Sequence, residues 1–317
     1  MSIKSFRRHL IRACALGAVA LIASAAPRGA SAATIFTDGF GDGDRDNNGL
    51  DSGATATDAT DVGIPFYLAA GTSAVTFRAT DDSAGIGTGN ALQLHNTGQN
   101  NRPTIGRIAA PVTLADGESL TLRFDMRLLS TTLVATGAAT TADRAVRFGI
   151  YHDSLGDYVA GDQSSTSAMY NDEVGYNARV DAGNDTSNTT SMDVTRDDTP
   201  LGTSAILQAT TTGISVSSTN AGDKLDDTLS HHFEMTLERV GTGLRVTLKQ
   251  DDNPAISNID ATPTGFMFEE VAFGVRSNAV MDLRIDNIQL EHAIPEPSSL
   301  ALAGLAAGGL LARRKRR

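Results

Sequence analysis

The sequence predicts an all-β protein built as an antiparallel two-sheet β-sandwich, and three observations support that fold class. Apolar side chains recur with a period of two, as in residues 119–129, where Leu, Phe and Met alternate with Thr, Arg and Asp. No helical periodicity runs longer than about two turns. The connecting segments are rich in Gly, Asp, Asn, Ser and Thr, which suit turns. Strands of this kind bury their apolar faces by stacking two sheets.

The predicted strands follow one another through the body of the chain, residues 33–293, which we interpret as one domain because sandwiches can exceed about 200 residues. They cover residues 119–129, 146–150, 174–178, 233–250, 270–275 and 281–291. Residues 233–250 form the clearest unit, a hairpin with a three-residue loop at Gly241-Thr242-Gly243. Glutamates on its first strand oppose Arg and Lys on its second, so one face should meet water. Residues 161–199 are predicted to be mostly extended loop.

The first 32 residues are predicted to be a secretory signal peptide. Basic residues precede an apolar run at 13–26, and Ala30-Ser31-Ala32 gives the small-x-small pattern of a cleavage site after Ala32. Ala23-Ser24-Ala25 is a second candidate cleavage site. We therefore expect a signal helix handled by the Sec export machinery. The single cysteine, Cys14, lies in the apolar run, so the mature chain should contain no cysteine.

Residues 294–317 contain three parts in a fixed order. Pro295-Glu296-Pro297 comes first, then the apolar run 298–312, then the basic cluster 313–317. The fifteen-residue run is shorter than the ~20 residues of a comfortable membrane span, and its basic end should stay cytoplasmic. We expect a short hydrophobic helix that occupies the inner membrane transiently.

This tripartite tail resembles the PEP-CTERM signal of bacterial surface proteins, in which an exosortase recognises the PEP motif. The resemblance implies export in a Gram-negative-type bacterium, processing near Pro295–Pro297, and a final place on the cell envelope, cell surface or extracellular matrix. Members of that family are associated with exopolysaccharide and biofilm matrix. The residues Pro295, Glu296 and Pro297 are then substrate for the sorting machinery.

The charge of the body excludes one class of function. The whole chain has a formal net charge of -11, but ten of its 26 basic residues and one of its 37 acidic residues lie in residues 1–32 and 296–317. The body between them therefore carries about −20. Such a surface repels nucleic-acid phosphates and favours cations.

The body also resembles a known architecture. The runs HHFEMTLERVGTGLRVTLKQDD, VAFGVRSNAV and MDLRIDNIQLE are similar to the closing strands of concanavalin-like or laminin-G-like jelly rolls. The earlier runs DGFGDGD and GTGNALQL fit the opening strands of the same fold. The resemblance covers most of residues 34–291 and implies a jelly-roll sandwich.

An acidic segment near the start of the body suggests calcium. Oxygen-bearing side chains recur at every second position from Asp42, as in calcium loops, but Thr55 stands where an EF-hand needs a closing Glu. Because jelly rolls bring first and last strands together, we expect Asp286 or Asn287 near Asp38. The candidate Ca²⁺ ligands are Asp38, Asp42, Asp44, Asp46, Asn48 and Asp286. The alternative is a solvated acidic turn.

Two further patterns concern glycans. Glu234 and Glu238 have the outer spacing of the E-x-D-x-E motif of family 16 glycoside hydrolases, but Thr236 replaces the central Asp. Residues four apart on a strand are about 13 Å apart, too far for a retaining pair. Tyr158 and Tyr170 lie in polar loops and are candidate sugar contacts.

These patterns together predict an exported surface or matrix protein without enzymatic activity, in a structural or adhesive role, with exopolysaccharide as its expected partner. Ca²⁺ is the only cofactor that the residues suggest. The alternative function is a glycan-active hydrolase of the concanavalin-like class.

Overall fold

The computed structural model describes the strands and turns of the sandwich. The described residues are 30–49, 51, 63–68, 75–83, 85–87, 89–97, 102–130, 145–156, 158–163, 168–170, 172–183, 190–198, 207, 212–276 and 280–295. The chain divides into one compact unit, Ala33–His292, and a second that joins Met1–Ala32 to Ala293–Arg317. The predicted signal helix and C-terminal apolar helix fall outside the described residues, and no described helix is long and apolar enough to span a membrane.

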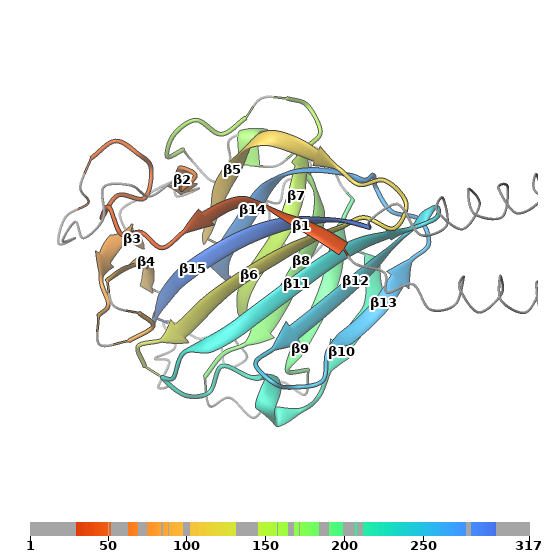
Figure 1. The fold of residues 1–317 in the computed structure, drawn as a ribbon. Coiled ribbons are helices and arrows are strands. Elements are labelled where there is room, and N and C mark those ends of the chain that lie inside the picture. The colour runs from red at the N-terminus through yellow and green to blue at the C-terminus, as the bar shows by residue number, and fades with distance from the viewer. Residues whose placement is uncertain are drawn as a thin grey trace, which may run out of the picture. The chain divides into compact units, whose positions relative to one another are not determined.

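Two antiparallel sheets face each other, which confirms the predicted sandwich (Figure 1). Sheet A has the order β13 (Ile256–Asp260), β12 (Gly243–Gln250), β11 (His231–Val240), β6 (Ser119–Leu128), β15 (Val280–Pro295), β4 (Asn90–Thr97), β3 (Val75–Asp81), with β1 (Ala30–Asp38) also paired to β15. Sheet B has the order β10 (Thr212–Ser218), β9 (Met192–Asp197), β8 (Glu173–Asp181), β7 (Ala145–Asp153), β14 (Met267–Arg276), β5 (Arg102–Thr113), β2 (Phe66–Leu68). The short 3₁₀ helices η1 (Ala168–Tyr170) and η2 (Ala221–Asp223) lie in connections.

The main core lies between the sheets and is centred on four phenylalanines. Phe124 of β6 stacks on Phe233 of β11, with ring centroids 5.4 Å apart. The same ring meets Phe148 of β7 and Phe273 of β14 edge-on, at 4.7 and 5.0 Å. These contacts join the central strands of both sheets, so the period-two residues of the sequence form the core.

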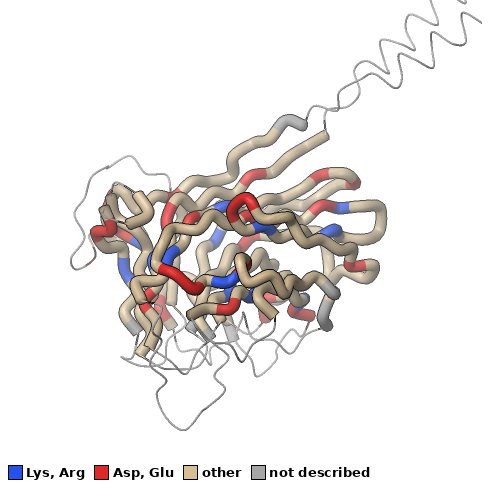
Figure 2. Tube along the Cα trace, turned by 90° about the horizontal axis from the view of Figure 1, so that it is seen from below, with Lys and Arg blue, Asp and Glu red and all other residues tan. Residues whose placement is uncertain are grey.

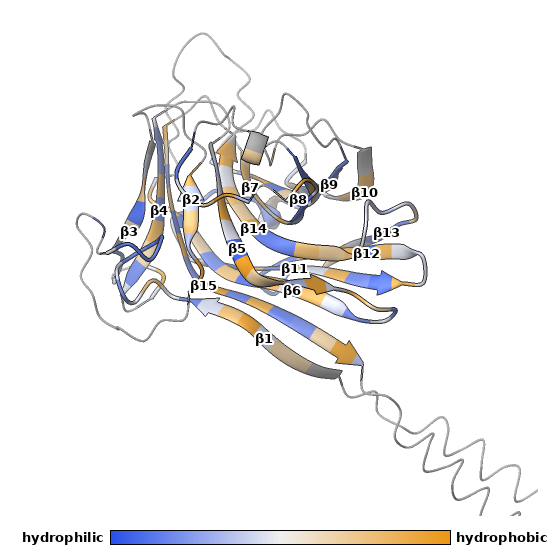
Figure 3. Ribbon diagram, turned by 90° about the horizontal axis from the view of Figure 1, so that it is seen from above, coloured by the Kyte–Doolittle hydropathy of each residue, from blue (hydrophilic) through white to orange (hydrophobic). Residues whose placement is uncertain are grey.

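The outer faces of the two sheets differ. Hydrophilic and hydrophobic residues alternate along β6 and β11 (Figure 3). Buried and partly exposed residues alternate in the same strands, so the outer face of sheet A meets water, as the sequence predicts. In β7 every residue except His152 is buried. Tyr151 and Ala272, which neighbour core residues in β7 and β14, belong instead to a second apolar cluster. Since successive side chains point to opposite faces, this cluster covers the outer face of sheet B.

Most predicted strands are confirmed, with two corrections. The β11–β12 hairpin pairs Val240 with Gly243, so its loop is the two residues Gly241-Thr242 and not three. Gly241 has a φ of 62°, which glycine adopts without a steric penalty. The second correction concerns residues 161–199, which contain β8 and β9. Strand β9 was not predicted because Arg196 occupies an inward-facing position where the pattern would need an apolar residue. The guanidinium of Arg196 donates a hydrogen bond of 2.8 Å to the carboxylate of Asp260.

Candidate functional site

The outer face of sheet B gathers three carboxylates, which we call the buried acid triad: Asp153, Glu173 and Glu270. Asp153 of β7 pairs directly with Glu173 of β8, and Glu270 of β14 pairs with Tyr151 of β7. Asp153 lies two residues from Tyr151 on the same face, so the three acids occupy adjoining positions. All three are nearly inaccessible, with exposed fractions of 4%, 3% and 0%.

The acids have unpaired oxygen atoms. Both carboxylate oxygens of Glu270, Oε2 of Glu173 and Oδ2 of Asp153 are buried without a hydrogen-bond partner. The remaining oxygen of Asp153 accepts the backbone N–H groups of Leu155 and Gly156, at 2.9 and 2.7 Å. Burial of unpaired carboxylates costs free energy, so such a group needs a structural or functional reason.

Burial and mutual repulsion change how these acids hold protons. Desolvation, followed by the charges of Asp153, Glu269 and other nearby carboxylates, raises the pKa of Glu270 to about 8. Desolvation and the charge of Glu270 also raise the pKa of Glu173 well above its usual value. The nearby Arg107, opposite Glu270 in β5, acts in the other direction on Glu270. The triad therefore favours either a bound proton or a bound cation at neutral pH.

Four of the five tyrosines surround or approach this face. Tyr151 lies flat against sheet B because glycines leave space for its ring: a Cβ added at Gly149 or Gly175 would come within 2.6 or 2.8 Å of it. Tyr170 of η1 is fully buried in the same apolar cluster, and its hydroxyl has no hydrogen-bond partner. The interpretation of Tyr170 as an exposed sugar contact is therefore wrong, because η1 places its ring under the surface.

The other two tyrosines are partly exposed and form what we call the tyrosine surface: Tyr67, Tyr158, Arg107 and Asp162. The guanidinium of Arg107 lies over the ring of Tyr158, 3.1 Å from its centroid. Asp162 accepts a hydrogen bond from Leu68 N at 2.9 Å and pairs with Arg45 at 2.7 Å. Gln163 N donates to Leu68 O at 3.1 Å, which holds the 158–163 segment beside β2. The predicted candidate Tyr158 is thus partly accessible.

The predicted calcium segment has another arrangement. Asp42 accepts the N–H of Asp44, and Asp44 accepts those of Asp46, at 3.0 Å, and of Gly49. These contacts are typical of Asx turns, in which the carboxylate folds the backbone. Asp46 pairs with Arg45 at 3.6 Å, and Asn48 is exposed.

The expectation that Asp38 lies near Asp286 or Asn287 is confirmed in part. Strand β1 pairs with β15, and a hollow of about 190 Å³ is lined by Asp38 and Asn287 together with Thr37, Gly39, Ile288 and Gln289. Asp38 accepts the N–H of Phe40 at 3.0 Å, and Asp286 that of Asn287 at 2.7 Å. Among the described residues, no three Asp, Glu, His or Cys side chains converge as they stand to hold a metal ion.

The hydrolase candidates Glu234 and Glu238 lie on the outer face of sheet A. Glu234 accepts from Arg123 Nε at 2.9 Å, and Glu238 from Arg245 at 2.6 Å. Their cross-strand neighbours are Arg123, Ser119, Lys249 and Arg245, none of which is aromatic. Both acids thus have a structural partner.

Parts of the predicted signal peptide and of the predicted sorting signal lie among the described residues. Ala30 and Ala32 lie at the start of β1, and Pro295 ends β15. Glu296 and Pro297 lie outside the described residues.

The sequence prediction missed the triad and Tyr67. One signal was available: in residues 268–275, the run Phe-Glu-Glu-Val-Ala-Phe-Gly-Val places small residues between apolar ones. A strand with small or apolar residues on both faces is covered on both faces, so a Glu within it is buried.

Comparison with known proteins identifies the C-terminal segment. Residues 293–317 match the family model described as the PEP-CTERM protein-sorting motif. A search of curated proteins gives no match. The motif marks this chain as an exported, cell-surface protein of a Gram-negative-type bacterium.

The chain is similar to several solved structures, among them these three. The metal-free carbohydrate recognition domain of Emp46p has a TM-score of 0.41 and 10% identity, covering 71% of this chain and 87% of that one. A galectin-like protein of unknown function from Bacillus subtilis has a TM-score of 0.43 and 11% identity, covering 73% and 90%. Peanut lectin has a TM-score of 0.38 and 12% identity, covering 72% and 97%. Similarity at this low sequence identity does not show what this chain does.

Proposed function

We propose that the exported chain is a non-enzymatic surface or matrix protein with a structural or adhesive role, and that it binds polysaccharide through the tyrosine surface. One observation carries the proposal: two partly exposed tyrosines, Tyr67 and Tyr158, border the same outer face of sheet B. A tyrosine ring offers an apolar face for the C–H side of a sugar and a hydroxyl for its polar edge.

The surroundings of the two tyrosines support a binding role. Arg107 fixes the orientation of the Tyr158 ring, and Asp162 offers a carboxylate with an exposed fraction of 48%. Arginine and carboxylate groups can donate to and accept from sugar hydroxyls. Both are held by strands or backbone contacts, so little conformational entropy is lost on binding.

The test measures retention of the mature protein on the producer's own exopolysaccharide, immobilised on a sensor surface. We expect Tyr67→Ala and Tyr158→Ala each to weaken binding roughly fivefold, which corresponds to the loss of one aromatic contact. Phe266→Ala is the matched control, because Arg239 lies over its ring at 4.0 Å in another part of the sandwich. Its binding should match the wild type.

Two outcomes would contradict the proposal: no binding by the wild type, or equal binding by all three variants. Thermal unfolding of each variant confirms that it is folded. Repeating the binding with a chelator tests the expected role of Ca²⁺ at the ligand surface.

The sorting partners are part of the same proposal. We infer that the Sec machinery exports the chain and that an exosortase processes it near Pro295, with the apolar run held briefly in the inner membrane. Mass spectrometry of the mature C-terminus should find a new end close to Pro295–Pro297. An intact C-terminus in the surface fraction would contradict processing. No specific observation favours the alternative of a glycan hydrolase, since both candidate acids are paired with arginine.

A further inference from the structure

We propose that the buried acid triad of Asp153, Glu173 and Glu270 is the binding site of a divalent cation, and that this cation is Ca²⁺. The site shares no residue with the tyrosine surface, which it adjoins where Arg107 lies opposite Glu270, or with the acidic turn at Asp42–Asn48. It does not depend on polysaccharide binding.

The first argument is position. Directly opposed residues in an antiparallel pair have Cβ atoms about 5 Å apart, and diagonal neighbours about 7–8 Å apart. Asp153 opposes Glu173, and Glu270 is the diagonal neighbour of Asp153 across β7 and β14. The three carboxylates therefore occupy neighbouring positions on one face of the sheet.

The second argument is the unpaired oxygens. Glu270 is completely buried, and neither of its oxygens has a hydrogen-bond partner. Glu173 and Asp153 each contribute one more buried, unpaired oxygen. The hydroxyl of Tyr170, which lies close enough to feel the charges of Glu173 and Glu270, is also unpaired. A cation would satisfy these atoms together.

The third argument is the chemistry of the ligands. All the unpaired groups are oxygen atoms, and the nearby imidazole of His152 is occupied by Glu269 at 2.8 Å. Oxygen-only sites suit hard cations, and Ca²⁺ accepts irregular carboxylate geometry more readily than Mg²⁺ does. An exported protein meets Ca²⁺ concentrations at which modest sites fill, with Kd about 10⁻⁴–10⁻³ M for extracellular modules.

The acids do not converge on a metal position as they stand. Glutamate has three rotatable side-chain bonds, and the unpaired oxygens of Glu173 and Glu270 are not held by hydrogen bonds. Binding therefore requires rotation of these two side chains toward Asp153. Asp153 itself is held by Leu155 N and Gly156 N, so it is the fixed ligand of the three.

The experiment combines thermal unfolding with terbium luminescence on the mature protein. We expect about 10 mM Ca²⁺ to raise the Tm by roughly 5 °C over the chelator control, and Mg²⁺ to raise it less. Tb³⁺ replaces Ca²⁺ and emits when a neighbouring tyrosine is excited. Because the chain has no Trp, the emission reports tyrosines such as Tyr151 and Tyr170 beside the triad.

Three variants locate the site. Glu270→Gln and Glu173→Gln should abolish the Ca²⁺-dependent Tm rise and reduce the emission at least tenfold. Both should fold, since the change removes a buried charge. Glu234→Gln is the matched control, because its carboxylate pairs with Arg123 on the other sheet, and it should respond like the wild type. Asp44→Asn tests the acidic turn and should also respond like the wild type.

Three results would overturn the proposal. The first is no Ca²⁺-dependent change in Tm or emission in the wild type. The second is an unchanged response in Glu270→Gln. The third is a response lost in Asp44→Asn but kept in Glu270→Gln, which would place the ion in the acidic turn. None of these results affects the test of the tyrosine surface, which uses different residues and a different ligand.

Discussion

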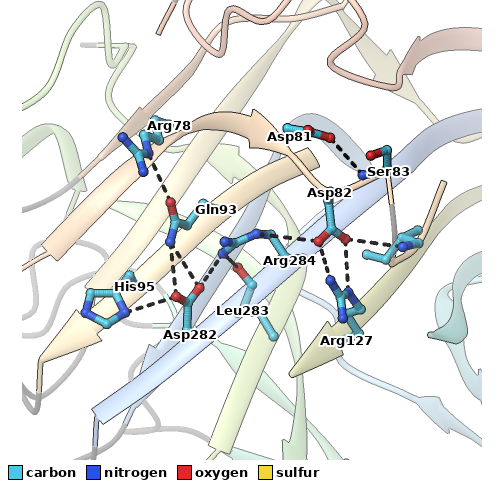
Figure 4. A network of polar contacts seen from close by, with 11 residues as sticks. Arg78, Asp81, Asp82, Ser83, Gln93, His95, Arg127, Asp282, Leu283 and Arg284 are labelled. Carbon is cyan, nitrogen blue, oxygen red and sulfur yellow. Dashed lines mark hydrogen bonds and ion pairs between the residues drawn. The ribbon is translucent and has the colours of Figure 1, made fainter. Parts of the chain in front are cut away.

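The buried acid triad of sheet B differs from the acids Asp82 and Asp282 at sheet A in whether a partner side chain holds each carboxylate. At sheet A, Asp82 accepts two hydrogen bonds from Arg127, one of them from Nε at 3.0 Å (Figure 4). Asp282 accepts hydrogen bonds from Gln93 and Arg284, and its carboxylate also lies beside the imidazole of His95. On sheet B, Glu173 and Glu270 are more deeply buried and have unpaired oxygens. Acidic and basic residues are interspersed along the chain (Figure 2), so the difference comes from local pairing.

This contrast separates acids that have a cationic partner from acids that have none. Several strand acids of sheet A have an arginine partner, including Glu234 and Glu291, which both contact Arg123. The same sequence leaves Glu270 with Arg107, whose guanidinium lies over Tyr158. A buried carboxylate without its own cation lowers the stability of the fold unless a proton or another ligand neutralises it.

The largest effect should come from breaking a pair on sheet A. Arg127→Ala leaves the Asp82 carboxylate, whose side chain is 5% exposed, without its main partner. Removal of one partner from a buried pair costs about 3 kcal/mol, because the remaining charge is desolvated and uncompensated. Urea unfolding at neutral pH measures the loss. A loss under about 1 kcal/mol would show that Arg284, 3.9 Å from Asp82, replaces Arg127 and that the pairing is redundant.

The opposite sign is expected on sheet B. In chelator at pH 8, Glu270→Gln should raise the free energy of unfolding by roughly 2 kcal/mol, because the wild-type carboxyl has a raised pKa of about 8. A raised pKa means that the folded state holds its proton more tightly than the unfolded chain. The stability from this proton is present at low pH and is lost as pH rises toward 8.

Unfolding measured between pH 5 and pH 8 checks this difference. The wild type should lose stability over the range more steeply than Glu270→Gln. A variant that is less stable than the wild type in chelator would mean that Glu270 has a partner in solution and would remove the contrast between the two faces.

The sandwich itself could be predicted from sequence, and particular residues show why. Period-two alternation reports burial on one face, and β6 and β11 obey it because the other face meets water. The acid triad could not be found this way. Its members lie in three strands, and their proximity depends on the β8–β7–β14 order, which no local pattern contains.

The calcium expectation shows a second limit. Alternating acids at Asp42 and Asp44 look the same in sequence whether they bind an ion or fold a turn, and here they accept backbone N–H groups. The proximity of Asp38 to Asn287 was predictable because first and last strands of a jelly roll are neighbours. Topology that follows from a fold class can be predicted, and side-chain direction in a turn cannot.

A smaller change in stability should come from His231 of β11, which pairs with two carboxylates. His231 contacts Asp251 through Nδ1 at 2.7 Å and Asp227 through Nε2 at 2.9 Å, a geometry that only the protonated ring satisfies. Burial acts to lower the pKa of His231, but the bonds to Asp251 and Asp227 outweigh it and raise the pKa. The stability from this pairing is therefore present at low pH and is lost as pH rises past the raised pKa.

We expect the loss to be less than about 1 kcal/mol, because both carboxylates are substantially exposed to solvent. Comparison of the wild type with His231→Gln from pH 6 to pH 8.5 isolates it, with His232→Gln as the control on the neighbouring, more exposed ring. Equal pH slopes in the wild type and His231→Gln would contradict the assignment.

The smallest effect should come from a well-exposed arginine–glutamate pair on the same face. Arg245 and Glu238 are 2.6 Å apart, but their side chains are 40% and 34% exposed, so water competes for both charges. A double-mutant cycle with Arg245→Ala and Glu238→Ala should give a coupling energy of about 0.5 kcal/mol or less. A coupling above about 1 kcal/mol would mean that exposure does not control the strength of pairing on sheet A. The contrast with sheet B would then rest on the presence of a partner alone, and not on burial.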